Sequence, residues 1–102
     1  MDIVKYFKDA IADYRPNFLR NNKSGKNFEI DIWIPSIKTA IEYDGYPWHK
    51  VETELSLEKF NLFKNTENIS KIYTFVENGC IIHSSSKHVN FLIPNNQNDK
   101  NF

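Results

Sequence analysis

Strict alternation of apolar and polar side chains from Phe28 to Ile34 is the feature that most limits how this chain can fold. The isoleucines of this stretch share one face of an extended strand with Phe28, while Glu29, Asp31 and Trp33 share the other face. Pro35-Ser36 interrupts the alternation, and a second β-rich run follows and ends at Gly45. The pattern predicts an antiparallel hairpin made of residues 28–34 and 37–44.

The register of this hairpin decides which side chains meet across it. A turn centred between Ser36 and Ile37 pairs residues at equal distances on either side of it. The expected pairs are Trp33 with Ala40, Asp31 with Glu42, and Glu29 with Asp44. All four carboxylates then lie on one face of the sheet.

Acids stacked in this way repel one another, which favours a cation between them. Carboxylate oxygens suit hard divalent ions such as Mg²⁺ or Mn²⁺, which polarise phosphates and activate water. We therefore predict a metal site at Asp31 and Glu42, helped by Glu29 or Asp44. The alternative is that the acids form a plain solvated strand face, and a slip of one residue in register would separate them.

His49 follows the second strand, just after Gly45 and Pro47. A histidine there can act as general base, metal ligand or proton donor to a leaving group, and a surface histidine without a role is an equal alternative. The neighbouring Trp48 is better explained by core packing than by stacking on a base. The more distant histidines His83 and His88 lie in a weakly patterned segment and receive no role.

The rest of the chain predicts an α+β fold with helices flanking the sheet. Helices are expected over Asp2–Tyr14 and Val51–Lys64, and further strands over Phe18–Arg20, Lys71–Val76 and Val89–Leu92, the last being optional. We expect a single domain over residues 1–94, followed by a disordered polar tail over residues 95–102.

Composition excludes several classes of protein. The 13 basic and 13 acidic residues cancel, so no overall positive field draws the chain to nucleic acid, and any such contact is local. The single cysteine, Cys80, permits no disulfide framework, which predicts an intracellular, cytoplasmic protein. We see neither a signal sequence nor an apolar run long enough for a membrane helix.

Residues 28–50 resemble a branch of the PD-(D/E)XK nuclease superfamily related to very-short-patch repair endonucleases and to EDxHD-type homing endonucleases. The elements that carry the resemblance are Glu-Ile-Asp-Ile-Trp-Ile-Pro, Ile-Glu-Tyr-Asp-Gly and Trp-His, and a weaker likeness extends to Glu77–Cys80. It implies a restriction-endonuclease-like αβββαβ core with a central mixed sheet, and Mg²⁺-dependent cleavage of DNA. By position, Asp31 matches the metal-binding aspartate, Glu42 the second acid and His49 the histidine of the Trp-His element, while Asp44 stands where most of the superfamily has lysine.

Two classes of function remain open, and with them the question whether the chain is an enzyme. The first is a metal-dependent DNA endonuclease, acting alone, as a homodimer or with a protein partner. The second is a catalytically degenerate member of that fold, acting as an accessory subunit or inhibitor of a DNA-handling complex. The clustered acids favour the first, and the neutral charge favours the second.

Overall fold

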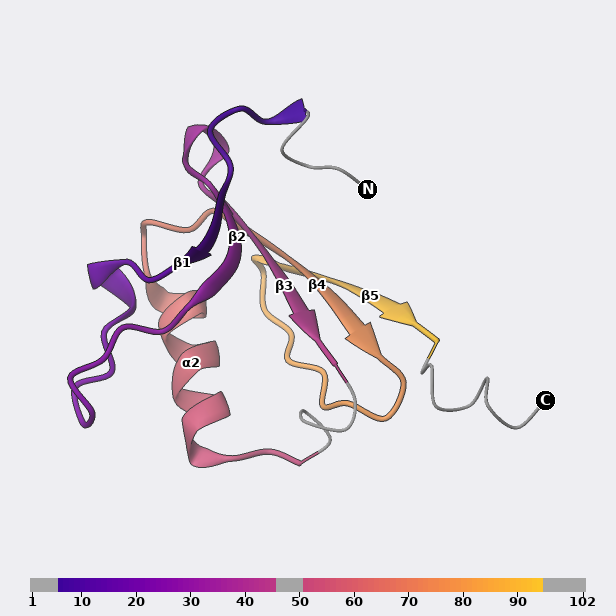
Figure 1. Ribbon diagram of the computed structural model, residues 1–102. Coiled ribbons are helices and arrows are strands. Elements are labelled where there is room, and N and C mark those ends of the chain that lie inside the picture. The colour runs from indigo at the N-terminus through magenta and orange to yellow at the C-terminus, as the bar shows by residue number, and fades with distance from the viewer. Residues whose placement is uncertain (1–5, 46–50, 95–102) are drawn as a thin grey trace.

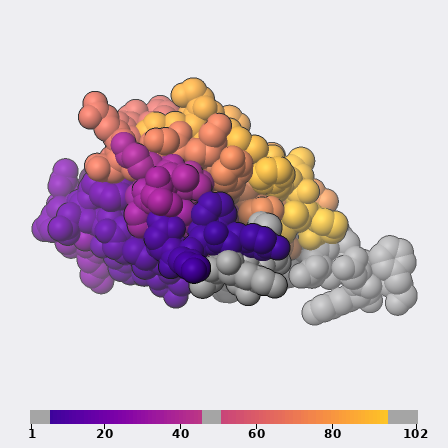
Figure 2. Space-filling model, turned by 90° about the horizontal axis from the view of Figure 1, so that it is seen from above, coloured from indigo at the N-terminus to yellow at the C-terminus, as the bar shows by residue number. Residues whose placement is uncertain are grey.

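A five-stranded sheet forms the centre of the protein in the computed structural model, which describes residues 6–45 and 51–94. The strands lie side by side in chain order: β1 (Ile11–Tyr14), β2 (Ile30–Ile34), β3 (Thr39–Asp44), β4 (Lys71–Glu77) and β5 (His88–Ile93). The β1–β2 and β2–β3 pairs are antiparallel, and the β3–β4 and β4–β5 pairs are parallel. Figure 2 shows this order as colours that run from indigo at one end of the molecule to yellow towards the other. The predicted α+β class with a mixed sheet is confirmed.

The predicted hairpin and its register are also confirmed. β2 and β3 pair through Ile32 with Ile41, Trp33 with Ala40 and Ile34 with Thr39. A short 3-10 helix (η2, Pro35–Ile37) turns the chain between them, as the proline predicts. Lys38 closes the turn in the left-handed region with φ of 49°, donating its N–H to the Pro35 carbonyl at 3.1 Å.

Helix α2 (Glu54–Asn65) links β3 to β4 and lies over one face of the sheet (Figure 1). The predicted helix is confirmed, but it begins three residues later than the expected Val51. Thr53 is the cause, because its side chain and that of Ser56 each accept the other's backbone N–H in a capping box. Among the helices of the described residues, none is long and apolar enough to cross a membrane.

The core lies between α2 and the sheet. Its buried members come from both layers and from the segments that join them, and they are Leu19, Ile30, Trp33, Ala40, Phe63, Ile69 and Ile72. The Trp33 ring packs against Tyr14, at 6.4 Å between centroids, and against Phe18, at 5.8 Å. These contacts attach the N-terminal segment to the hairpin.

The helix predicted over Asp2–Tyr14 is wrong from Phe7 onward: residues 7–10 form a turn, and the last four residues form β1 and pair with β2. The apolar spacing that indicated a helix is not a core-facing stripe, because Ile11 is 40% exposed. Pairing with β2 instead gives that strand's outer edge a hydrogen-bonded neighbour, and this tertiary contact outweighs local propensity. Residues 1–5 lie outside the described ranges.

The strand predicted over Phe18–Arg20 is also wrong. Asn17–Leu19 form a 3-10 helix (η1), in which the Leu19 N–H donates to the Pro16 carbonyl at 3.2 Å. Arg20 keeps only an isolated bridge to Asn27. This turn points Leu19 into the core, where it is fully buried. The optional last strand is confirmed as β5, and the predicted tail over residues 95–102 lies outside the described residues.

Candidate metal and phosphate site

The two central acids of the hairpin are joined by hydrogen bonds to the main chain of the opposite strand. The Asp31 N–H donates to Glu42 Oε2 at 2.8 Å, and the Tyr43 N–H donates to Asp31 Oδ2 at 2.9 Å. These bonds begin where the regular β2–β3 pairing ends, at Ile32 and Ile41. The predicted meeting of Asp31 and Glu42 is therefore present, and each carboxylate also holds the end of the hairpin together.

Glu42 is buried, with 7% of its surface exposed, because α2 covers its face of the sheet. The alternative of a plain solvated strand face is therefore wrong for this residue. Its Oε1 accepts an ion-pair contact from Lys59 of α2 at 2.8 Å. Burial raises the pKa of Glu42 to about 7, with the Asp31 charge adding to the rise and Lys59 opposing it. Glu42 is thus an acid that changes charge near neutral pH.

A pocket of about 360 Å³ opens between α2 and the sheet above Glu42. Its polar lining includes side chains from β3, β4, β5, α2 and the β4–β5 connection, namely Glu42, Asp44, Thr53, Ser56, Lys59, Thr74, His83, His88 and Asn90. Its apolar lining comprises Phe28, Val51, Leu55, Phe60, Phe63, Ile72 and Ile81. A concave apolar wall with a few converging polar groups is typical of a small-molecule or substrate site.

The other predicted site residues are distributed unevenly around this pocket, and Asp31, although bonded to Glu42, does not line it. Asp44 lines it together with Glu42, as the shared face of β3 predicts. Glu29 does not join them, since it precedes β2 and forms an ion pair with Arg15 at 3.2 Å. His49 falls within residues 46–50, outside the described ranges, so its predicted role stays a prediction.

Sequence reasoning missed three groups that the structure brings to the pocket: Lys59, His83 and His88. A signal for Lys59 exists, because it lies four residues before Phe63, the residue of α2 that is buried in the core. Side chains at this spacing share a helix face, so Lys59 had to point towards the sheet. His83 comes from the β4–β5 connection and His88 from the start of β5. The sequence there has no periodic pattern that would predict which way these side chains point.

His88 sits in a partly buried place at the back of the pocket. Its Nδ1 is 2.5 Å from the Ser85 hydroxyl oxygen, and its ring is tilted on Phe60 at 5.2 Å. Burial lowers the pKa of His88, and the positive charges of His83 and Lys87 lower it further. A neutral imidazole is therefore favoured at this position.

The described residues contain no group of three or more histidine, cysteine or acidic side chains arranged to hold a metal. Asp31 and Glu42 alone are too few for zinc, which requires three or four protein ligands. Two carboxylates do suit Mg²⁺, which keeps several waters and is commonly held by one or two carboxylates and the substrate phosphate. Asp31 and Glu42 supply such oxygens, and their mutual repulsion would be relieved by a dication.

Comparisons with known proteins add no relative to this picture: no family model matches the chain, and no curated protein or solved structure is significantly similar to it.

Proposed function

We propose that this chain is a metal-dependent nuclease that hydrolyses phosphodiester bonds of DNA in the pocket between α2 and the sheet. The observation that carries the proposal is the Asp31–Glu42 pair, in which two acids interact and Glu42 is buried. Glu42 lines a pocket that also holds Lys59, and Asp31 lies beside Glu42 without lining that pocket. Burying an acid beside another acid costs free energy, and a cation-dependent reaction gives that arrangement a use. The motif resemblance of residues 28–50 supports the same reading.

The roles we assign follow from donor type and place. Asp31 and Glu42 would hold Mg²⁺ or Mn²⁺, and Asp44 lines the same pocket as Glu42. The ion would neutralise charge on the phosphate and make its phosphorus easier to attack. Lys59, whose side chain is 34% exposed, places a second positive charge beside Glu42. His49 is assigned proton transfer on the resemblance alone.

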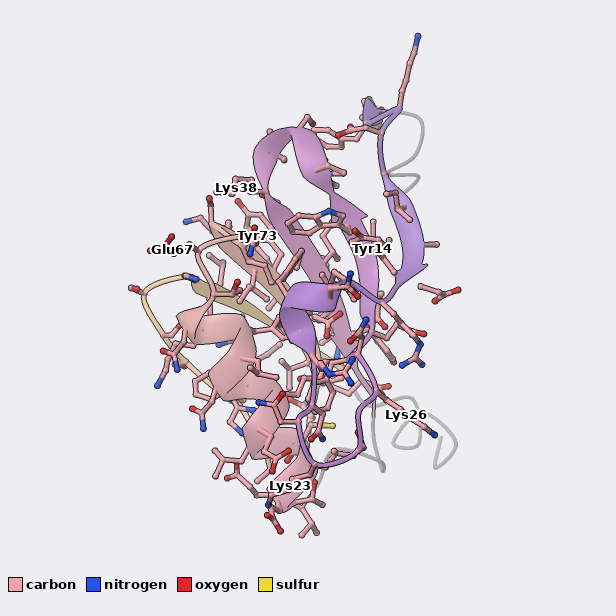
Figure 3. The ribbon with its side chains drawn as sticks, turned by 90° about the vertical axis from the view of Figure 1, so that its left-hand side faces the viewer. Tyr14, Lys23, Lys26, Lys38, Glu67 and Tyr73 are labelled. Carbon is pink, nitrogen blue, oxygen red and sulfur yellow. The ribbon has the colours of Figure 1, made fainter. Side chains whose placement is uncertain are left out.

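The proposed DNA contact is local, in keeping with the neutral chain. The polar turn before β2 carries Lys23 and Lys26, whose side chains differ in direction and in their contacts (Figure 3). Lys23 is held by the acids Glu54 and Glu58 at the start of α2, whereas Lys26 points outward. Lys26 is therefore the lysine of this turn that we expect to contact the phosphate backbone.

The test is to incubate the purified chain with plasmid and with single-stranded DNA, in Mg²⁺, in Mn²⁺ and in chelator. We expect cleavage in metal only. Asp31→Asn should eliminate cleavage because it removes a metal oxygen, and His49→Ala should leave a trace, since a proton-transfer group is worth about 10²–10⁴-fold in rate.

Glu67→Gln is the matched control for loss of one acid. Glu67 is exposed beyond the C-terminal end of α2 and does not line the pocket (Figure 3). The Glu67→Gln variant should cleave DNA like the wild type. Equal cleavage by wild type and Asp31→Asn would assign the activity to a contaminant and refute the proposal.

One observation favours a second candidate, a non-catalytic accessory subunit or inhibitor of a DNA-handling complex. Asp31 and Glu42 already have protein partners in two backbone N–H groups and Lys59, so the hairpin does not require an ion to be stable. A wild-type chain that is inert on every DNA form, yet binds DNA or a DNA-handling protein, would establish this candidate instead.

A further inference from the structure

A carboxylate–imidazole pair, Glu52 and His83, lies at the same pocket, which His83 lines. His83 Nε2 is 2.6 Å from Glu52 Oε1, and the His83 ring stacks on Phe60 with 4.7 Å between centroids and 24° between planes. The Glu52 carboxylate lies just before α2, and His83 lies in the connection from β4 to β5. Figure 1 shows this connection returning on the α2 side of the sheet.

The backbone of His83 is also fixed. The Asn90 side chain of β5 donates from Nδ2 to the His83 carbonyl at 2.9 Å, and the same group is 3.4 Å from the Ser84 hydroxyl. Contacts from three places in the chain thus set the position of one loop histidine: Glu52 before α2, Phe60 within it, and Asn90 in β5. Such convergence is expected where an imidazole must be presented in one orientation.

The hydrogen bond to Glu52 also determines which ring nitrogen of His83 remains available for proton exchange. An ionised carboxylate only accepts hydrogen bonds, so Nε2 carries a hydrogen and donates it to Glu52. Nδ1 is then the nitrogen left to exchange a proton, and within the described residues it has no hydrogen-bond partner. His83 lines the pocket that contains Glu42 and Asp44.

We propose that His83 is the general acid of this pocket and that Glu52 is its positioning residue, an inference that rests on the proposed nuclease function. Water adds to phosphorus while the bond from phosphorus to the leaving oxygen breaks. The leaving oxygen takes the proton of Nδ1, so the product is an alcohol. The proton lost by the attacking water passes to solvent, and solvent reloads Nδ1.

Two histidines share this pocket and the Phe60 ring, and they make a natural comparison. His88 packs on the same ring, but its partner is the Ser85 hydroxyl and no described carboxylate is bonded to it. The charged or titratable groups that line the pocket around His83 are His88, Lys59, Glu42 and Asp44, with Glu52 bonded directly. His88→Asn therefore changes the pocket without removing the carboxylate-oriented imidazole.

The test combines nuclear magnetic resonance with kinetics on the full chain. Imidazole ¹⁵N spectra of neutral His83 should show hydrogen on Nε2, and Glu52→Gln should weaken that preference. In Mg²⁺-dependent DNA cleavage, His83→Asn should lower kcat about 10²–10⁴-fold and remove the fall in rate at alkaline pH that a general acid produces. Glu52→Gln should lower kcat but keep that alkaline limb, and His88→Asn should keep it as well.

The possible results distinguish the role of His83 from the proposed nuclease activity. An inert wild type refutes both. An active wild type whose pH profile is the same in His83→Asn, or a neutral His83 with hydrogen on Nδ1, refutes the role of His83 and leaves the nuclease proposal standing. Loss of the alkaline limb in His83→Asn alone, with the expected tautomer, supports it.

Discussion

Glu42→Gln should make the protein more stable, and the gain should depend on pH. Burial raises the pKa of Glu42 from the ordinary 4.5 to about 7 in the folded state. Between these values the folded protein binds a proton that the unfolded chain does not, so the free energy of unfolding falls as pH rises. At ~1.4 kcal/mol for each pH unit, the full cost above pH 7 is about 3 kcal/mol.

Glutamine resembles the neutral acid and does not incur this cost. The variant should therefore equal the wild type near pH 4.5 and exceed it by about 3 kcal/mol at pH 8, a figure that already includes the attraction of Lys59, because that attraction contributes to the pKa. Urea unfolding of both proteins at several pH values, without metal, measures the difference. A gap that is constant with pH, or a less stable variant at pH 8, would refute the argument that burial controls this acid.

Three further predictions concern metal binding, His88 and the core residue Phe63. Mg²⁺ or Mn²⁺ should raise the melting temperature of the wild type, since a ligand of the folded state stabilises it by mass action, and Asp31→Asn should abolish the rise; identical curves in both proteins would contradict the site. The lowered pKa of His88 means that the unfolded chain takes up a proton first as pH falls below 6.5, so the wild type should lose stability relative to His88→Gln between pH 7.5 and 5.5. Urea unfolding at both values checks the sign. Phe63→Ala should cost about 3–5 kcal/mol, because the ring is 3% exposed within the core, and a loss below 1 kcal/mol would show that α2 packs differently.

Much of the hairpin was predictable, and the reason is physical. Alternation over residues 28–34, a proline break and a second run leave few registers that bury the isoleucines, and the pairing of Trp33 with Ala40 follows. β1 was not predictable in this way: it has four residues, the first three exposed, so its sequence carries no core-facing pattern. Only its partner β2 makes it a strand.

The candidate site was predictable in part for the same reason. Period-2 geometry places Glu42 and Asp44 on one face, but it does not say which face a helix will cover. The structure decides this through the parallel pairing of β3 with β4, because α2 joins those strands and must lie over one side of them. His83 was beyond sequence reasoning, since its position depends on Glu52, Phe60 and Asn90 from separate parts of the chain.

The ion pair of Glu42 and the packing of α2 belong to one contact between helix and sheet. Lys59 and Phe63 are one turn apart on α2, so the turn that places Phe63 in the core also brings Lys59 to Glu42. Loosening this contact in Phe63→Ala should admit water to Glu42 and return its pKa towards 4.5. Glu42→Gln should then gain less stability at pH 8 in the Phe63→Ala background than in the wild type. A double-mutant cycle measures this coupling, and strictly additive effects would show that the charge of Glu42 is independent of how α2 packs.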